Sequence, residues 1–514
     1  MTYPVIDLFA GPGGLGEGFA SLNGGKAFKI AVSAEMEESA HRTLSLRAFF
    51  RHVRNAGDEK GLKAYYDFCH SASAPHPSAA MPTAWAVAQY EAQRLTLGEE
   101  QDNAKLDHLL RKAKVRENDR TVLIGGPPCQ AYSLVGRSRN RGKKDYVAEE
   151  DHRHFLYREY LRVVQKIRPA VFVMENVKGI LTAKVNDRLV FHDILRDMAA
   201  PSEALGKSRG PRYRIHSLVN NDVFEKDMNP QEIDVARFII ESEKYGIPQC
   251  RHRVILLGVR EDLMYSGGHH LTPAQRITLQ DAISDLPPLR SRLSKGDGDD
   301  IWREEVHAMA ERLQKDAIRK GMDQVALAMR GEALNLGGSL ETGSLRYGPR
   351  HNPKAKDRYH GWIADSRLDV WLNHEARSHM ASDLARYFYV ASFGKAHGRT
   401  PKGHQSFTLD GLAPNHKNWE SGHFIDRFRV QLANEPSTTV TSHIAKDGHY
   451  FVHPDGSQCR SLTVREAARL QSFPDNYFFQ GNRTQQYHQV GNAVPSLLAS
   501  QIAAAVKRIL NESS

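Results

Sequence analysis

The sequence predicts an α/β fold in which a doubly wound, mostly parallel sheet is joined to a second, irregular domain. Short apolar runs typical of buried strands occur at residues 3–9, 28–34, 121–124, 170–174 and 253–259. Helical periodicity over 152–167 separates two of these runs, and strand, helix and strand at this spacing indicate parallel βαβ units. After Pro287-Pro288 the composition turns polar and glycine-rich until about residue 455, which indicates the second domain.

The remaining elements follow in chain order. Between the second and third predicted strands, residues 48–118 contain Pro/Ala/Ser-rich stretches and two helix-like runs, at 83–97 and 99–113. Near the C-terminus, Leu462–Phe473 has the pattern of an amphipathic helix, and Pro495–Leu510 has that of a final helix. The chain of 514 residues is long enough for two or more domains with separate cores.

The amino-acid composition limits which binding partners and which cellular compartment are expected. The net charge of +10 and the pI near 9.2 favour a polyanionic partner such as DNA or RNA, although a merely basic protein has the same balance. Four scattered cysteines without a CxxC pair argue against a zinc site or a disulfide scaffold. No apolar run reaches the roughly 18 residues that span a bilayer, and the N-terminus lacks the pattern of a signal peptide. We therefore expect no membrane association and a reducing, intracellular setting.

A glycine-rich turn follows the first predicted strand. Gly11, Gly13 and Gly16 fit the pattern GxGxxG, and Glu35 follows the second strand. Glycines let the backbone approach a ligand, and a carboxylate at this place can hold ribose hydroxyls. The turn therefore indicates a nucleotide-like cofactor without choosing one, and a glycine turn with no ligand is the alternative.

Two strand ends present reactive side chains. The run Val122–Ile124 leads into Gly-Gly-Pro-Pro-Cys129, so a rigid turn presents one thiol at the carboxyl edge of the sheet, where α/β folds place ligands. Another apolar strand ends at Glu175, and a carboxyl group at the end of a buried strand can act as a proton donor. Taken singly, each residue has a structural alternative, which is a packed cysteine or a loop carboxylate.

The segment Gln249-Cys-Arg251-His-Arg253 enters the next predicted strand. On one continuous strand, alternate residues face the same side, so these three long polar side chains are expected to lie together. Such a face suits a base edge, a phosphate or buried carboxylates, and arginine forks also lock loops. Farther along, Thr463 and Glu466 have the spacing of a capping box at the start of a helix.

In this order the motifs resemble those of the C5-cytosine DNA methyltransferases. They read DLFAGPGG, PPCQ, ENV, QxRxR, RxLTxREAxRLQxFP and GNAVP. The resemblance covers residues 3–36, 121–180, 242–260 and 460–505. PPCQ and ENV followed by QxRxR make the combination specific, whereas residues 48–118 and 290–455 carry no motif.

The resemblance implies that Cys129 is the nucleophile. Its thiolate would add to C6 of cytosine, because carbon 5 attacks a methyl-sulfonium group only after that addition. Glu175 matches the carboxyl group that acts on N3 of the base, as general acid catalysis requires. Arg251 and Arg253 match the arginines that hold the base and order the pocket. The accompanying substrate-binding candidates are Gln130, Asn176 and Gln249.

The resemblance also implies S-adenosyl-L-methionine as the methyl donor and no metal. Glu35 matches the carboxylate on the ribose, Met36 the bulky residue against adenine, and Asn492 the residue that brings the last helix beside the first strand. The family's short acidic adenine-binding motif has no clear counterpart, and Leu97-Gly98 is the candidate place for it. The cofactor-binding candidates are Phe9, Gly11, Gly13, Gly14, Leu15, Glu35, Met36, Pro127 and Asn492.

By this resemblance, residues 1–288 form a catalytic and cofactor-binding domain with an insertion at 48–118, and 456–514 complete it. Residues 289–455 take the place of the target recognition domain. Between Arg346 and Lys417, twelve Lys/Arg stand against six Asp/Glu, with seven His and interleaved aromatic residues. That composition suits a groove-reading surface, and an irregular solvated domain is the alternative.

The implied substrate is double-stranded DNA, bound by a monomer. A target base cannot be reached inside a stacked duplex, so base flipping is expected. The expected setting is the prokaryotic cytoplasm, with action on the nucleoid and a cognate restriction endonuclease as a functional partner. The target sequence is not predicted.

Three other functions compete with this one. An RNA (tRNA) C5-cytosine methyltransferase of the same family shares the motifs, but such relatives usually lack a large recognition domain. A nicotinamide dehydrogenase explains GxGxxG but leaves PPCQ, ENV and QxRxR unexplained. An inactive DNA-binding module does not need both Cys129 and Glu175.

Overall fold

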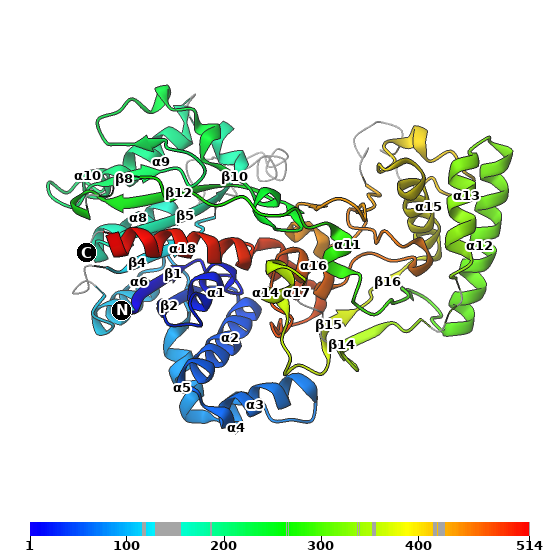
Figure 1. The fold of residues 1–514 in the computed structure, drawn as a ribbon, viewed down its shortest axis with the longest axis horizontal. Coiled ribbons are helices and arrows are strands. Elements are labelled where there is room, and N and C mark those ends of the chain that lie inside the picture. Colours follow the sequence, from blue (N-terminus) through cyan, green and yellow to red (C-terminus); the bar gives the residue numbers. More distant parts are fainter. Residues whose placement is uncertain are drawn as a thin grey trace.

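Figure 1 shows the protein as a computed structural model with a sheet-containing body and a helical lobe beyond one side of it. The structure describes residues 1–115, 120–128, 156–185, 188–263, 265, 267–336, 338, 340–351, 356–414, 419 and 427–512. The N- and C-terminal ends lie on the same side of the body, far from the lobe.

The body is built on a nine-stranded sheet with the order β3-β2-β1-β4-β5-β12-β8-β9, and β10 pairs with β12. All pairings from β3 to β5 are parallel, whereas β12 runs antiparallel to β5, β8 and β10. The predicted α/β fold is therefore confirmed. The strands are β1 (Tyr3–Leu8), β2 (Phe28–Glu35), β3 (Ala92–Arg94), β4 (Val122–Gly125), β5 (Val171–Val177), β8 (Tyr213–His216), β9 (Val223–Phe224), β10 (Ile239–Glu241) and β12 (His252–Arg260).

Helices cover both faces of the sheet, because alternate strand residues bury apolar side chains on opposite sides. On one face, Val5 joins a core with α1 (Gly14–Ser21) and α18 (Ser496–Glu512). On the other face, Ile6 and Leu8 join a core with α6 (Glu100–Lys112), α8 (Leu156–Ile167) and α9 (Val190–Ala199). The red helix α18 crosses the sheet beside α1 in Figure 1. The C-terminal segment therefore completes a core that the N-terminal segment begins.

The segment 48–118 is only partly separate from the sheet. The expected helix over 83–97 is wrong at its end: α5 (Pro82–Glu91) stops, and β3 follows at once. β3 pairs in parallel with β2, with Ala92 opposite Ser33, so backbone pairing at the sheet edge overrides the helical pattern. The expected helix at 99–113 is confirmed as α6.

The lobe contains more helix than its polar composition suggests. α12 (Asp299–Arg319), α13 (Asp323–Ala333) and α15 (Ala381–His397) share an apolar core. Within α12, Trp302, Val306, Met309 and Leu313 recur at helical spacing and are buried. This periodicity was readable in the sequence.

The other helices and strands complete the body and its junction with the lobe. The remaining helices are α2 (Glu38–Ala56), α3 (Glu59–His70), α4 (Pro77–Ala80), α10 (Pro201–Ala204), α11 (Leu279–Ile283), α14 (Arg358–Ile363), α16 (Val464–Leu470) and α17 (Arg483–Asn492). The remaining strands are β6 (Lys184–Val185), β7 (Arg188–Leu189), β11 (Gln249–Cys250), β13 (Arg292–Leu293), β14 (Gly343–Tyr347), β15 (Trp371–Glu375), β16 (Ser378–His379) and β17 (Ser437–Thr438).

The stretch that contains α17 and α18 includes a strongly apolar window. Residues Arg483–Glu512 are long and apolar enough to cross a membrane by length and composition alone, but 78% of the apolar window is buried inside the protein. Because α18 packs along α1, its apolar side chains are those of a core helix.

Candidate active site

Two of the predicted catalytic residues, Glu175 and Arg253, meet at the carboxyl edge of β5. Glu175 lies near the end of β5, and Arg253 lies at the start of β12, which pairs with β5 in antiparallel register. Arg253 Nε donates to Glu175 Oε1 at 2.9 Å, and both side chains are largely buried. Burial lowers the pKa of Arg253, and the Glu175 carboxylate opposes that shift. The pair is thus a buried ion pair at the edge where the sequence predicts catalysis.

The turn after β4 lies directly against this carboxyl group. A Cβ atom on Gly126 would be 3.0 Å from Glu175 Oε2, so glycine lets the turn pass close to the carboxylate. Asn176 is buried, its Nδ2 donates to Pro127 O at 3.4 Å, and its Oδ1 accepts from Val177 N at 2.8 Å. The ENV residues therefore hold the Gly-Gly-Pro-Pro turn in place.

The predicted nucleophile follows this turn in sequence. Cys129 and Gln130 come directly after Pro128 and lie outside the residues that the structure describes. Their roles stay predictions. The three other cysteines, Cys69, Cys250 and Cys459, carry free thiols, and burial raises the pKa of each.

Alternation along one strand predicts that the three long side chains of QxRxR share one face. The structure differs, because the strand is not continuous there. The strand is interrupted at Arg251, whose backbone N–H donates to Gln249 O at 2.9 Å. Arg251 Nη1 donates to Val440 O at 2.8 Å and to Gly491 O at 3.3 Å. Only Arg253 reaches Glu175, so the interruption sends the two arginines to different partners.

Gln249 is likewise engaged within the protein. Its Nε2 donates to Leu470 O at 3.0 Å, and its Oε1 accepts from Val440 N at 2.7 Å. The side chain is fully buried. Together with Arg251, it ties the start of β12 to the segments around residues 440, 470 and 491.

The predicted cofactor turn runs from the end of β1 into α1. Phe9, Gly11 and Gly13 all have positive φ, at 57°, 58° and 99°, which folds the chain back on itself. Gly11 N donates to Glu35 Oε2 at 2.8 Å, and Glu37 N donates to Glu35 Oε1 at 2.7 Å. Burial raises the pKa of Glu35, and these N–H donors oppose the shift. The structure therefore brings the turn and the predicted ribose carboxylate together.

The other cofactor candidates differ in their surroundings. Pro127 is buried at the same edge, and Met36 is 57% exposed directly after Glu35. Gly14 and Leu15 belong to the packing of α1: a Cβ on Gly14 would be 2.4 Å from Val494 O, and Leu15 lies in the core. The Asn492 side chain is exposed at the end of α17.

The candidate place for the adenine motif follows β3. Because β3 continues the parallel order beside β2, with Arg94 opposite Glu35, Leu97 and Gly98 come after the same sheet edge. Asp102 supplies a carboxylate there, since Thr96 N donates to its Oδ2 at 2.7 Å. The assignment of Leu97-Gly98 stays a prediction.

Sequence reasoning missed one polar residue beneath the cofactor turn. Asp7 is 1% exposed on β1, and neither carboxyl oxygen has a hydrogen-bond partner within the described part of the chain. The signal was present, because Asp7 is the polar residue in the otherwise apolar run YPVIDLF. An orphaned buried carboxyl group beside a cofactor turn fits a ligand that brings a positive group.

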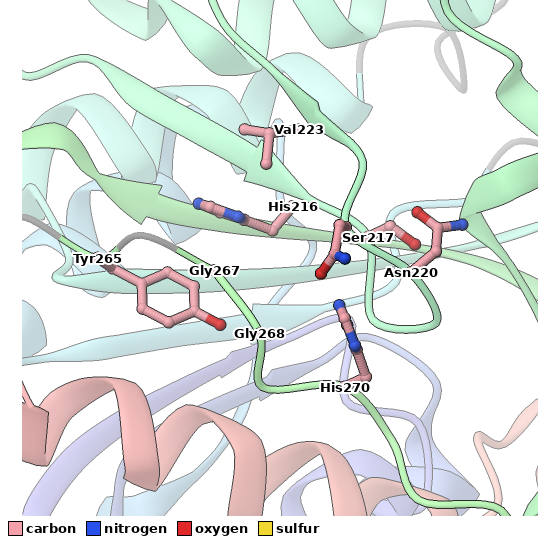
Figure 2. Close-up of a pocket in the computed structure, with 9 residues that line it drawn as sticks. His216, Ser217, Asn220, Val223, Tyr265, Gly267, Gly268 and His270 are labelled. Carbon is pink, nitrogen blue, oxygen red and sulfur yellow. The ribbon is translucent and has the colours of Figure 1, made fainter.

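A separate cavity of about 270 Å³ lies elsewhere on the sheet. Figure 2 shows that the side chains of His216, Tyr265 and His270 gather around it. His216 is level with Leu257 on β12, whereas Arg253 lies nearer the start of that strand. The cavity is therefore offset from the ion pair of the candidate active site.

Comparison with known proteins places the chain among DNA methylases. The family model described as C-5 cytosine-specific DNA methylase matches residues 78–201 and 222–508. The type II methyltransferase M.Bpa9945I of Bacillus paralicheniformis is 34% identical, with 99% of each chain covered. The DNA (cytosine-5-)-methyltransferase M.ApeKI of Aeropyrum pernix is 26% identical, also with 99% of each chain covered.

A solved structure supports the same fold. A crystal structure described as a DNA modification methyltransferase encoded within a prophage (E. coli) has a TM-score of 0.55 at 18% identity and covers 99% of each chain. The family match spans most of the chain, and it includes the described parts of the candidate site that follow residue 78. The chain therefore belongs to the C-5 cytosine-specific DNA methylase family and is a DNA (cytosine-5-)-methyltransferase.

Proposed function

We propose that this enzyme methylates carbon 5 of a flipped cytosine in a specific duplex DNA sequence, through a covalent bond between Cys129 and C6. The observation that carries the proposal is the ion pair of Glu175 with Arg253, packed against the turn that leads into Cys129. This arrangement supplies a carboxyl group and a guanidinium group at the place where the thiol-bearing segment begins.

The division of labour within the ion pair follows from its geometry. Arg253 Nε occupies Glu175 Oε1, which leaves Oε2 beside Gly126 to meet N3 of a cytosine. A proton shared with N3 draws electrons from the ring and favours addition of the Cys129 thiolate at C6. Arg253 also carries a positive charge at the edge where the flipped base would present its O2 oxygen. Once carbon 5 carries the methyl group, a base removes the C5 proton, the electrons of that C–H bond expel the thiolate from C6, and N3 returns its shared proton to Glu175.

S-adenosyl-L-methionine fits the residues around the β1 turn. Glu35 is positioned by two backbone N–H groups at the end of β2, where a ribose carboxylate is needed. Met36 offers an exposed apolar side chain next to it for the adenine. When bound, the cofactor supplies the methyl-sulfonium group that carbon 5 attacks.

The first test is substitution of the nucleophile. Cys129→Ala is expected to abolish methyl transfer and to leave cofactor binding largely intact, because the turn residues that hold the cofactor do not change. Duplex DNA with 5-fluorocytosine at the target is expected to trap a covalent complex with the native protein, since fluorine does not leave as a proton does. Full methyl transfer by the Ala variant would overturn the assignment of Cys129.

The substrate class is tested by comparing duplex DNA with tRNA. We expect labelled methyl transfer to duplex DNA, because residues 289–455 fill the place of a recognition domain. The exposed basic side chains there include Lys356, Arg358, Arg399 and Lys402. Other basic side chains of this segment are buried and do not face solvent: Arg350 forms an ion pair with Asp475, and Arg386 forms one with Asp383. Transfer to tRNA alone would favour the RNA alternative.

The biological role proposed here is modification within a restriction–modification system. The relatives M.Bpa9945I and M.AgeI are named type II methyltransferases, which supports a cognate restriction endonuclease as the functional partner. We propose that the enzyme acts as a monomer on DNA of the nucleoid, in the cytoplasm of a prokaryote. Mapping methylated cytosines in exposed DNA would identify the protected sequence.

A further inference from the structure

The helix α3, within the segment 48–118, carries no motif and has no task in the mechanism above. Figure 1 shows that it lies next to β14, which belongs to residues 289–455, the recognition segment of the proposed function. A helix that contacts both this segment and the catalytic body can fix the position of one against the other.

Hydrogen bonds join α3 to the recognition segment at two places. Tyr66 OH donates to Asp365 Oδ2 at 2.6 Å, and Arg346 donates to Phe68 O through Nε at 3.1 Å and through Nη2 at 3.0 Å. The Arg346 guanidinium also lies 5.2 Å from the centre of the Phe68 ring. Burial raises the pKa of Tyr66, and the Asp365 carboxylate raises it further, so this hydroxyl keeps its proton and stays a donor.

Apolar packing extends the same contact. Tyr65 and Tyr66 of α3 share a buried core with Leu368 and Leu372 of the recognition segment. Close-packed side chains resist sliding past one another, and the hydrogen bonds add a defined geometry. The helix α3 and residues 346–372 therefore form one packed unit, which we call the α3 contact.

The Asp365 carboxylate is also held from the body. Asn476 Nδ2 donates to Asp365 Oδ2, the same oxygen that Tyr66 reaches. Arg47 of α2 donates to Asn476 Oδ1 at 2.8 Å, and its other two nitrogens donate to Glu17 of α1 at 2.6 and 2.9 Å. Both Arg47 and Glu17 are buried. One carboxyl oxygen thus stands where α3, the body and the recognition segment meet.

We propose that α3 sets the position of the recognition segment against the catalytic body, with Tyr66 and Asp365 as positioning residues for site-specific methylation. The inference rests on the proposed function, in which residues 289–455 fill the place of a recognition domain. The recognition segment holds the duplex and the body holds Glu175, so their relative position decides whether the selected cytosine reaches the carboxyl group. A misplacement of about 1 Å can cost 10²-fold in rate.

The consequence differs between the target sequence and other sequences. At the target, the recognition segment and the active site are aligned through the α3 contact, so loosening this contact slows methyl transfer. At other cytosines the alignment is already lost, and the same change costs less. Loosening the α3 contact should therefore lower the ratio of target to off-target methylation.

The experiment treats plasmid DNA of known sequence with the full chain and maps methylated cytosines at low conversion. Tyr66→Phe keeps the ring and removes the hydroxyl, and it is expected to lower the ratio about 2- to 30-fold. Affinity for S-adenosylhomocysteine should stay within about twofold, because the cofactor turn is unchanged. Tyr157→Phe is the matched control, since its hydroxyl donates to the Asp197 carboxylate at 2.9 Å between α8 and α9, and the ratio should not change.

Further variants separate positioning from folding, and the urea midpoint of each variant reports whether it is folded. In a protein that already carries Asp365→Ala, Tyr66→Phe should change the ratio less than about twofold, because the partner of the hydroxyl is gone. If Tyr66→Phe does not fold, Arg346→Lys decides by the same ratio, because lysine lacks the fork that grips Phe68 O.

An unchanged ratio in Tyr66→Phe, beside site-specific methylation by the native protein, would overturn the inference. An equal fall in Tyr157→Phe, or an undiminished effect of Tyr66→Phe beside Asp365→Ala, would do the same. A native protein that methylates no cytosine, or that methylates cytosines without sequence preference, would instead count against the proposed function.

Discussion

At the residue scale, the two carboxyl oxygens of Glu175 have different surroundings. One oxygen is held by Arg253, and the other faces the turn at Gly126. Because the ion pair is nearly dry, removing one partner leaves an uncompensated charge, whereas an amide of the same shape keeps one hydrogen bond. An isosteric change therefore separates proton transfer from packing.

Glu175→Gln is expected to slow the chemical step by about 10²–10⁴-fold, since one proton-transfer partner is lost. DNA affinity should change little. The protein should stay folded with a lower unfolding midpoint, because Gln Oε1 can still accept from Arg253 Nε but no longer balances its charge. Single-turnover methyl transfer and a DNA-binding titration measure the two effects separately.

A matched control lies close by. Glu243 accepts from His252 Nε2 at 2.8 Å, and that pair stands next to Arg253 on the chain. Glu243→Gln should leave the rate within about twofold, as expected for substitutions away from special features. If Glu175→Gln loses no rate, or if it unfolds the protein, the carboxyl group has only a structural role.

Residue identities were easier to predict than residue tasks. Glu175, Arg253 and Glu35 could be placed from the sequence, because each stands at or next to the end of an apolar run. The tasks of Gln249 and Arg251 could not, because their partners are backbone carbonyls nearly two hundred or more residues away. Asp7 was visible as a polar residue in a strand, but its lack of a partner is a three-dimensional property.

At the element scale, α1 and α18 lie unusually close together. A Cβ on Gly18 would be 2.4 Å from Ala499 Cβ and 2.4 Å from Ser500 N. Gly18→Ala must therefore push two backbones apart, which costs about 1–3 kcal/mol and outweighs the gain in helix propensity of about 1 kcal/mol. Urea denaturation should show a lower midpoint.

The control for this change is a helical glycine in open space. Gly331 lies in α13, and a Cβ there would have no neighbour within 4 Å. Gly331→Ala should raise stability by about 0.5–1 kcal/mol through helix propensity alone. A Gly18→Ala protein as stable as the Gly331→Ala protein would contradict the close contact.

Elements with strong periodicity were predictable, and edge elements were not. The strands β1, β2, β4, β5 and β12 coincide with apolar runs, so burial identifies them. β3 has only three residues and was expected to be helical, because its strand state comes from pairing with β2 rather than from its own pattern. The length of α12 follows from apolar spacing that the polar composition of the region obscured.

At the scale of the whole molecule, residues 343–379 anchor the segment 289–455 to the body. Tyr66 OH donates to Asp365 Oδ2 at 2.6 Å, Arg346 Nη2 donates to Phe68 O at 3.0 Å, and Asn373 Nδ2 donates to Phe479 O at 3.0 Å. The helices α12, α13 and α15 are outside these anchors and form their own core. The helices of the lobe can therefore be exchanged while the anchoring residues 343–379 are kept.

We predict that residues 289–455 choose the DNA sequence. Replacing this segment with that of a relative of different target should transfer the target, because base contacts within it carry the specificity, each worth about 1–3 kcal/mol. A second chimera that keeps the native residues 343–379 preserves the anchors and controls for misfolding. Mapping of methylated cytosines reads both.

One outcome would contradict the recognition role of residues 289–455. An active chimera that still methylates the original sequence would move recognition to another part of the chain, with 48–118 the next candidate. In that segment, α3 lies beside residues 343–379, as the contact of Tyr66 with Asp365 shows. Exchange of 58–91 would then be the next experiment.

The packing of α18 against α1 also has a consequence for biosynthesis. During translation, β1 and the glycine turn leave the ribosome long before the helix that covers them, and Tyr477, whose hydroxyl donates to Pro12 O, is also made late. The nascent chain cannot close the core against α1 until α18 has been made. A chain that stops before Tyr477 would thus lack both the cover of α1 and the contact at Pro12, so the body can close only after residues 289–455 have been made.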